Sequence, residues 1–206
     1  MNYKTEQEKY WAEKFGDDYI KRNRDLKIVS SNIRLFSEIF KFLYKPPEYV
    51  LELGANIGLN LIAIKQLIPS VQIDAVEINE KAYKELKKLK FISNVWNKSI
   101  LEFTPSKKYD FVFTKGVLIH INPEFLEIIY KIIYEASSCY ICIIEYYNPT
   151  PVEIEYRGKR GLLFKRDFAG EFLDMFKDVK LVHYGFIYHR DNIFPQDDIT
   201  WFLLKK

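Results

Sequence analysis

The letters VLELGANIG, residues 50–58, constrain the fold more than any other stretch of this chain. They describe an apolar strand that breaks into a loop bracketed by Gly54 and Gly58, and a helical pattern follows. A second apolar stretch, residues 71–78, carries Glu77 near its end, where a carboxylate can accept hydrogen bonds from the two hydroxyls of a ribose. A strand, a glycine loop, a helix and a strand ending in an acid together predict an adenosine-cofactor site and favour an enzyme.

The spacing of the glycines discriminates between adenosine cofactors. A dinucleotide site uses G-x-G-x-x-G, because the backbone must approach a pyrophosphate at the helix N-terminus, and here Asn56 replaces the middle glycine. Glu52 adds a negative charge that would repel a phosphate but attract a cationic amino group. The pattern E-x-G-x-x-x-G with a later acid resembles motif I of class I S-adenosylmethionine-dependent methyltransferases.

This resemblance implies a role for each matching residue. Glu52 would lie near the methionine ammonium of S-adenosyl-L-methionine, and Glu77 would hold the ribose. Many members carry an aspartate after the third strand to hold the adenine amino group. Ser99 stands there instead, and a hydroxyl accepts a hydrogen bond less strongly than a charged group. The expected cofactor-binding residues are Glu52, Gly54, Asn56, Gly58, Glu77, Ile78, Ser99, Ile100 and Lys115.

Composition narrows the class further. A chain of 206 residues with 48% apolar and 17% aromatic residues is expected to form a single globular domain, residues 1–206. A net charge of +3 is too small to argue for nucleic acid or an acidic membrane as a partner. We recognise no signal peptide or membrane-spanning run, and interpret the C-x-x-C of Cys139 and Cys142 as two small buried hydrophobes. We therefore expect a cytoplasmic protein without a metal, and the oligomeric state stays open.

Alternating apolar patterns predict a doubly wound, Rossmann-like α/β sheet of about seven strands, mostly parallel, with a C-terminal antiparallel hairpin. Helices are expected to flank it, and residues 1–45 to form a helical cap on a core of residues 46–206. The expected strands are residues 49–53, 71–78, 94–98, 108–114, 138–146, 179–189 and 199–204. The expected helices are residues 59–68, 80–90 and 166–176, and one that Asn122 caps with Pro123 at its first position.

The acceptor of the transferred group is expected beyond the carboxyl ends of the fourth and fifth strands, where ligands bind in open parallel sheets. A hydroxyl or protonated amine acceptor needs a base, and His120 or Glu145 could serve. Each residue could instead have a purely structural role. His120 could bridge backbone groups, and Glu145 could form an ion pair with Arg157 or Arg166.

A basic and aromatic loop, residues 148–165, is expected over this end of the sheet and suits an anionic acceptor, although an ordinary solvated loop is the alternative. The expected substrate-binding residues are Tyr19, Tyr146, Tyr147, Asn148, Tyr156, Arg157 and Arg166.

A second resemblance spans nearly the whole chain. The letters TEQE, FGDDYI, ELGANIG, KGVLIHINP, EYYNPTP and YRG together are similar to methyltransferases associated with pseudaminic acid biosynthesis clusters. That resemblance implies methylation of a small acidic sugar, or its nucleotide conjugate, in a surface glycan pathway.

Other functions stay open at this point. The chain could methylate a different small molecule, or bind the cofactor as a non-catalytic subunit. A NAD-type oxidoreductase is disfavoured by the missing middle glycine and by Glu52.

Overall fold

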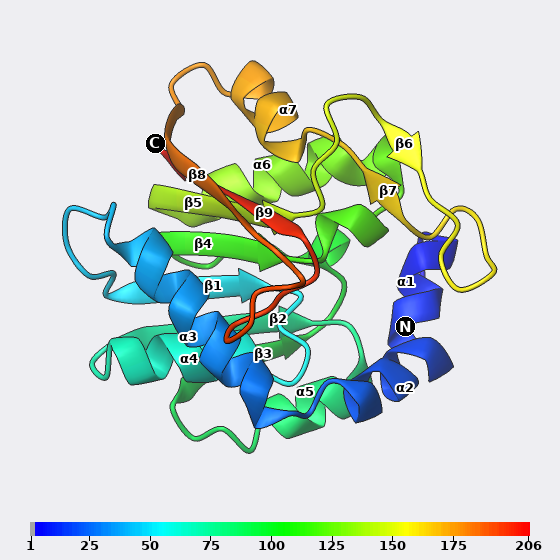
Figure 1. Cartoon of the computed structure of the whole chain (residues 1–206), viewed down its shortest axis with the longest axis horizontal. Helices are drawn as coiled ribbons and strands as arrows, with labels where there is room; N and C mark the ends of the chain where they lie inside the picture. Colours follow the sequence, from blue (N-terminus) through cyan, green and yellow to red (C-terminus); the bar gives the residue numbers. More distant parts are fainter. Residues whose placement is uncertain (1–2) are drawn as a thin grey trace.

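The alternating apolar segments form one seven-stranded sheet with helices on both faces (Figure 1). The computed structural model describes residues 3–206, apart from the side chain of Leu26. Within these residues the sheet contains β1 (Tyr49–Leu53), β2 (Gln72–Glu77), β3 (Ile92–Asn97), β4 (Tyr109–Lys115), β5 (Ser137–Glu145), β8 (Lys180–Ile187) and β9 (Ile199–Lys205). The α-helices are α1 (Glu6–Ala12), α2 (Lys14–Arg22), α3 (Leu26–Phe40), α4 (Leu59–Leu67), α5 (Glu80–Leu86), α6 (Leu126–Ala136) and α7 (Phe168–Met175).

The strand order is β3-β2-β1-β4-β5-β9-β8, with β1 paired in parallel to both β2 and β4. The direction of winding therefore reverses beside β1, and in open α/β sheets ligands bind beyond the carboxyl ends of the strands at such a reversal. The last two strands run antiparallel, β9 against β5 and β8 against β9. The predicted doubly wound sheet with its C-terminal hairpin is confirmed.

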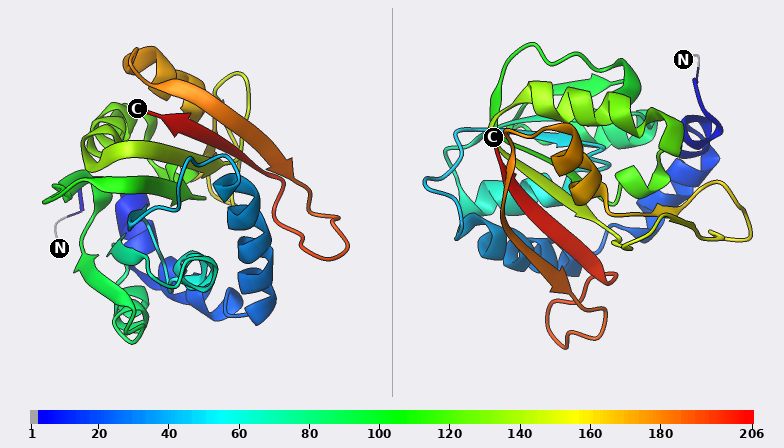
Figure 2. Two further views of the ribbon diagram at one scale, coloured as in Figure 1. Left: turned by 90° about the vertical axis from the view of Figure 1, so that its left-hand side faces the viewer. Right: turned by 90° about the horizontal axis from the view of Figure 1, so that it is seen from above.

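Two apolar cores hold the layers together. Successive residues of a strand point to opposite faces, so Val50 enters the core shared with α3, α4 and α5, whereas Leu51 enters the core shared with α6 and α7. Both side chains are fully buried. Figure 2 shows α3 and α6 on opposite sides of the sheet. This double covering explains why the central strands are apolar along their whole length.

The first helices follow from local capping. Thr5 accepts a hydrogen bond from the backbone of Glu8, and the Glu8 side chain accepts one from the backbone of Thr5, which is a capping box. Figure 1 shows α1 and α2 beside the carboxyl ends of the parallel strands, near the loop that follows β5. The N-terminal region therefore reaches the end of the sheet where a ligand is expected.

Several boundaries differ from the prediction. Helix α5 ends at Leu86 and not at residue 90. The helix after Asn122 begins as a 3-10 turn, Pro123–Phe125, before α6. Part of the loop after β5 pairs as a short antiparallel ribbon, β6 (Val152–Glu153) with β7 (Phe164–Lys165), which its polar, glycine-containing letters did not indicate.

Candidate functional site

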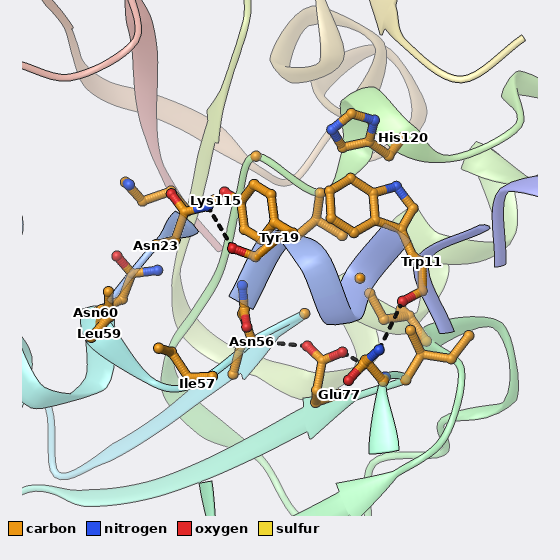
Figure 3. Close-up of a pocket in the computed structure, with 18 of the residues that line it drawn as sticks. Trp11, Tyr19, Asn23, Asn56, Ile57, Leu59, Asn60, Glu77, Lys115 and His120 are labelled. Carbon is orange, nitrogen blue, oxygen red and sulfur yellow. Dashed lines mark hydrogen bonds between the residues drawn. The ribbon is translucent and has the colours of Figure 1, made fainter. Parts of the chain in front are cut away.

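A cavity lies at the carboxyl ends of β1, β2 and β4, with about 1160 Å³ of space including its open mouth. Figure 3 shows side chains from α1 and α2 on one side and from the β1–α4 loop and β2 on the other. Residues that line it include Glu8, Trp11, Tyr19, Asn23, Gly54, Asn56, Asn60, Glu77, Ile78, Ser99, Ile100, Lys115 and His120. Most of the predicted cofactor residues are thus brought together, whereas Glu52 and Gly58 lie behind the wall.

The glycine loop has the left-handed backbone that its letters indicate. Gly54 and Gly58 have φ values of 81° and 83°. A Cβ at Gly54 would lie 2.6 Å from a methyl group of Val117, so a side chain there would clash with the turn after β4. Asn56, in place of the middle glycine, has a φ of 47°, a conformation that asparagine tolerates better than most residues. The loop therefore keeps its shape without that glycine.

The carboxylate of Glu77 holds this loop in place through hydrogen bonds to its backbone. Its Oε2 accepts a hydrogen bond from the backbone nitrogen of Asn56, and its Oε1 accepts one from the backbone nitrogen of Asn79, both at 2.7 Å. Burial raises the pKa of Glu77 to about 7, against the opposing effect of these two bonds. Each carboxylate oxygen keeps a second lone pair, so Glu77 is able to accept further hydrogen bonds from the cavity.

Glu52 differs from the expectation, because it is fully buried and does not line the cavity. Its Oε1 accepts a hydrogen bond from Nδ2 of Asn60, a lining residue, at 2.6 Å. Its Oε2 has no partner among the described residues, and burial raises its pKa to about 8. Burial also lowers the pKa of Lys115, whereas the charge of Glu52 opposes that shift. Glu52 thus influences the cavity only indirectly, through its hydrogen bond with Asn60 and its charge near Lys115.

Ser99 lines the cavity, and its hydroxyl group is already engaged in two hydrogen bonds. Its Oγ accepts a hydrogen bond from the backbone nitrogen of Leu101 at 3.0 Å and donates one to Oε1 of Glu8. Glu8 also lines the cavity, and no pattern in the sequence predicts that a carboxylate of helix α1 lies there. The T-x-x-E capping box marks the start of α1, but the partner of Glu8 across the fold is visible only in the structure.

His120 bonds to a backbone carbonyl group and also reaches the cavity. It lines the cavity, and its Nδ1 lies 2.7 Å from the carbonyl oxygen of Leu162. A carbonyl only accepts, so Nδ1 carries the proton and Nε2 keeps its lone pair. Burial lowers the pKa of His120 to about 4, which keeps the ring neutral near pH 7. Its ring centroid is 4.6 Å from that of Trp11 and 5.2 Å from that of Tyr156.

The structure contradicts both of the roles predicted for Glu145, a catalytic base and a member of an ion pair. It is buried, does not line the cavity, and accepts hydrogen bonds from the backbone nitrogens of Val117 and Leu118 at 3.1 Å. It therefore caps the 3-10 turn that carries His120. The alternative ion pair is not found among the described residues either, because Arg166 pairs with Glu171 at 2.7 Å.

The predicted acceptor residues separate into two groups. Tyr19 lines the cavity, and Tyr156 reaches it through His120 and through Phe15, whose ring centroid lies 5.7 Å away. The other five do not line it: Tyr146 and Asn148 are half-buried, Tyr147 is exposed, Arg157 is exposed beside Tyr156, and Arg166 pairs with Glu171. Fewer of the predicted substrate-binding residues therefore reach the cavity than expected. Trp11, Asn23 and Asn60 are wall residues that the sequence patterns did not identify.

Comparison with known proteins gives no matching family model and no matching curated relative. Solved structures do match. A Burkholderia thailandensis 1,6-didemethyltoxoflavin-N1-methyltransferase with S-adenosylhomocysteine is 16% identical, with a TM-score of 0.72 over 100% of this chain and 92% of that one. Magnesium protoporphyrin IX methyltransferase from Synechocystis PCC 6803 with S-adenosylmethionine is 14% identical, with a TM-score of 0.68 over all of both chains.

The plantazolicin methyltransferase BpumL in complex with S-adenosylhomocysteine gives a TM-score of 0.67 at 14% identity, over 97% of this chain and 93% of that one. At such low identity these likenesses establish only that the chain shares the Rossmann-like fold of these proteins.

Proposed function

We propose that this protein is an S-adenosyl-L-methionine-dependent methyltransferase that acts on a small molecule. The observation that carries the proposal is the cavity at the strand-order reversal, where the left-handed glycine loop and buried Glu77 meet. The fold shared with methyltransferases whose structures contain S-adenosylmethionine or S-adenosylhomocysteine supports it.

The polar groups around the loop fit such a cofactor better than a dinucleotide. Asn56 Oδ1 and Asn60 Oδ1 are buried acceptors in the cavity wall without a partner among the described residues. Unpaired acceptors suit a ligand that brings positive charge and N–H donors, such as an amino acid ammonium, and oppose a pyrophosphate. In this proposal Glu77 holds the ribose hydroxyls, and the apolar side chains of Ile78 and Ile100 flank the adenine.

When bound, the cofactor supplies a methyl group on a positively charged sulfur and leaves as S-adenosylhomocysteine once that carbon–sulfur bond breaks. His120 then has a defined task. Its Nδ1 proton is held by Leu162, so Nε2 is free to take a proton from an acceptor hydroxyl or amine as the oxygen or nitrogen bonds to carbon. Trp11 and Tyr19 orient the acceptor and exclude water from this end of the cavity.

For the acceptor we propose a small acidic sugar or its nucleotide conjugate, of the pseudaminic acid type. Lys115 is a half-buried amine in the wall near Tyr19, with no ion-pair partner within 4 Å among residues 3–206, and it suits a carboxylate (Figure 3). Arg157 and Lys159 lie on the loop next to Tyr156 and Tyr10 and add positive charge at the rim. The sequence resemblance to methyltransferases of pseudaminic acid clusters supports the same class.

The wider setting is also part of the proposal. We propose one domain over residues 1–206, with the N-terminal helices and the loop of residues 148–165 on the acceptor side, acting in the cytoplasm. Within the described residues, none of the helices has the length and apolar character needed to cross a membrane.

The test is methyl transfer itself. Purified protein is incubated with S-adenosylmethionine that carries a deuterated methyl group, and with a panel of acidic sugars, their nucleotide conjugates and matched neutral sugars. Mass spectrometry should find the label on an acidic member and not on its neutral counterpart. Label on neutral sugars would reject the acidic acceptor class. Cofactor binding without transfer to any member would instead favour another small molecule or a non-catalytic subunit.

A further inference from the structure

We infer that Glu8, on the N-terminal helix α1, is the residue that selects adenine, by accepting a hydrogen bond from the amino group of the purine. The inference rests on the proposed cofactor and deepens it. It moves the selective contact from the sheet, where Ser99 stands, to a helix that precedes the first strand in sequence.

Glu8 is a buried carboxylate in the cavity wall. Only 7% of its surface is exposed, and no lysine, arginine or histidine among residues 3–206 lies within ion-pair distance of it. Its Oε2 accepts hydrogen bonds from the backbone nitrogens of Lys4 and Thr5, at 2.5 and 3.1 Å, and its Oε1 accepts one from Ser99. Hydrogen bonds alone thus compensate its negative charge.

Counting lone pairs shows where a ligand donor would be accepted. A carboxylate offers about four acceptor positions. Oε2 of Glu8 uses two and Oε1 uses one, so the open position is on Oε1, the oxygen beside Ser99. Ser99 itself is engaged, because it donates its only proton to Glu8 and accepts from Leu101. Glu8 is therefore the stronger remaining acceptor of the two.

The surroundings of this oxygen fit a purine edge. Ser99 and Ile100 follow β3, Ile78 follows β2, and all three line the cavity with Glu8. A flat apolar base can lie against the two isoleucines, and a carboxylate at its edge accepts from an amino group. The same carboxylate repels a purine that carries a carbonyl oxygen at that position, because neither group has a proton to donate.

The experiment compares the binding of two ligands by calorimetry, S-adenosyl-L-homocysteine and S-inosyl-L-homocysteine, which differ in the group at C6 of the purine and in the proton that the inosyl ligand carries on N1. The unsubstituted protein should prefer the adenosyl ligand by about ten- to a hundredfold, the usual effect of one hydrogen bond to a charged group. Glu8→Gln should reduce this preference to within about threefold, because an amide can also donate to the inosyl oxygen. Glutamine also serves in a capping box, so α1 should still form.

Two further variants make the test decisive. Glu6→Gln, an exposed residue of the same helix, is the matched control and should keep the full preference. Ser99→Ala leaves the carboxylate in place and should also keep it. A full preference in Glu8→Gln, or its loss in Ser99→Ala alone, would overturn the inference. If the unsubstituted protein binds neither ligand, the proposed function fails with it, whereas binding with an unaltered ratio in Glu8→Gln overturns only the role of Glu8.

Discussion

The two ends of the cavity are built in different ways. The cofactor end comes mainly from two neighbouring strands and the loop between them, where Glu77 holds the backbone of Asn56. The acceptor end joins segments far apart in sequence, since His120 contacts Trp11 from α1 and Tyr156 from the loop after β5. The first end is specified by a local motif and the second by tertiary packing. Substitutions at the two ends should therefore affect different measured quantities.

His120→Ala should give the largest difference between the effect on turnover and the effect on cofactor affinity. Loss of a general base lowers turnover by about 10²–10⁴-fold, whereas affinity for S-adenosylhomocysteine should stay within about twofold. His189→Ala, an exposed histidine in the connection between β8 and β9 that does not line the cavity, is the matched control. Because the pKa of His120 is lowered to about 4, its protonation should not reduce the rate between about pH 8 and pH 6. Equal losses in turnover and affinity would show that the two ends are not separate.

Glu77→Ala tests the cofactor end. If Glu77 holds the ribose as proposed, the substitution removes two hydrogen bonds to it and should weaken S-adenosylhomocysteine binding at least tenfold, or about 1.4 kcal/mol. The backbone nitrogens of Asn56 and Asn79 also lose their acceptor, so the free energy of unfolding should fall by about 1–3 kcal/mol for each. Calorimetry and urea unfolding measure the two effects. Unchanged affinity at reduced stability would limit Glu77 to shaping the loop.

Glu52→Gln tests the buried carboxyl group that lies behind the cofactor end of the cavity. The pKa of Glu52 is raised to about 8, above its unfolded value near 4.5, so the native state binds more protons than the unfolded state between these values. Glu52 therefore makes the protein less stable as the pH rises through this window, by about 1.4 kcal/mol per pH unit at most. Urea unfolding between about pH 5 and pH 9 should show a flatter dependence in Glu52→Gln. Parallel curves would indicate that Glu52 is already ionised.

Arg157→Ala should have the smallest effect. Its side chain is exposed at the rim, 5.7 Å from the ring of Tyr156, and surface charges contribute about 0–1 kcal/mol. We expect a few-fold rise in KM for an anionic acceptor and no change in S-adenosylhomocysteine affinity. Arg160→Ala, also exposed in this loop, is the control. A change in cofactor affinity alone would place Arg157 at the wrong end of the cavity.

The sequence predicted well what depends on local periodicity. Strand β1 has the expected bounds, Gly54 and Gly58 have the left-handed backbone that the motif indicates, and Gly54 and Glu77 line the cavity. Each of these features follows from residues close to one another along the chain. The loop keeps its left-handed backbone without the middle glycine, because asparagine also adopts a positive φ.

The errors concern partners that lie far apart in sequence. Glu145 reads as a base or an ion-pair member, yet the backbone of residues 117–119 uses both of its oxygens. Ser99 gains Glu8 as a partner 91 residues away, and such pairing has no signature in the letters around either residue. Hydrogen bonds of this kind depend on how the helices pack on the sheet, which periodicity alone does not determine.

The central claim is tested most directly by calorimetric titration of the purified protein with S-adenosylmethionine and S-adenosylhomocysteine, with NADH as the control. Saturable binding of the first two ligands, and none of NADH, is the predicted result. Binding of NADH would contradict the proposed cofactor and favour an oxidoreductase. Binding of none of the three ligands would also contradict it and favour another role for this fold.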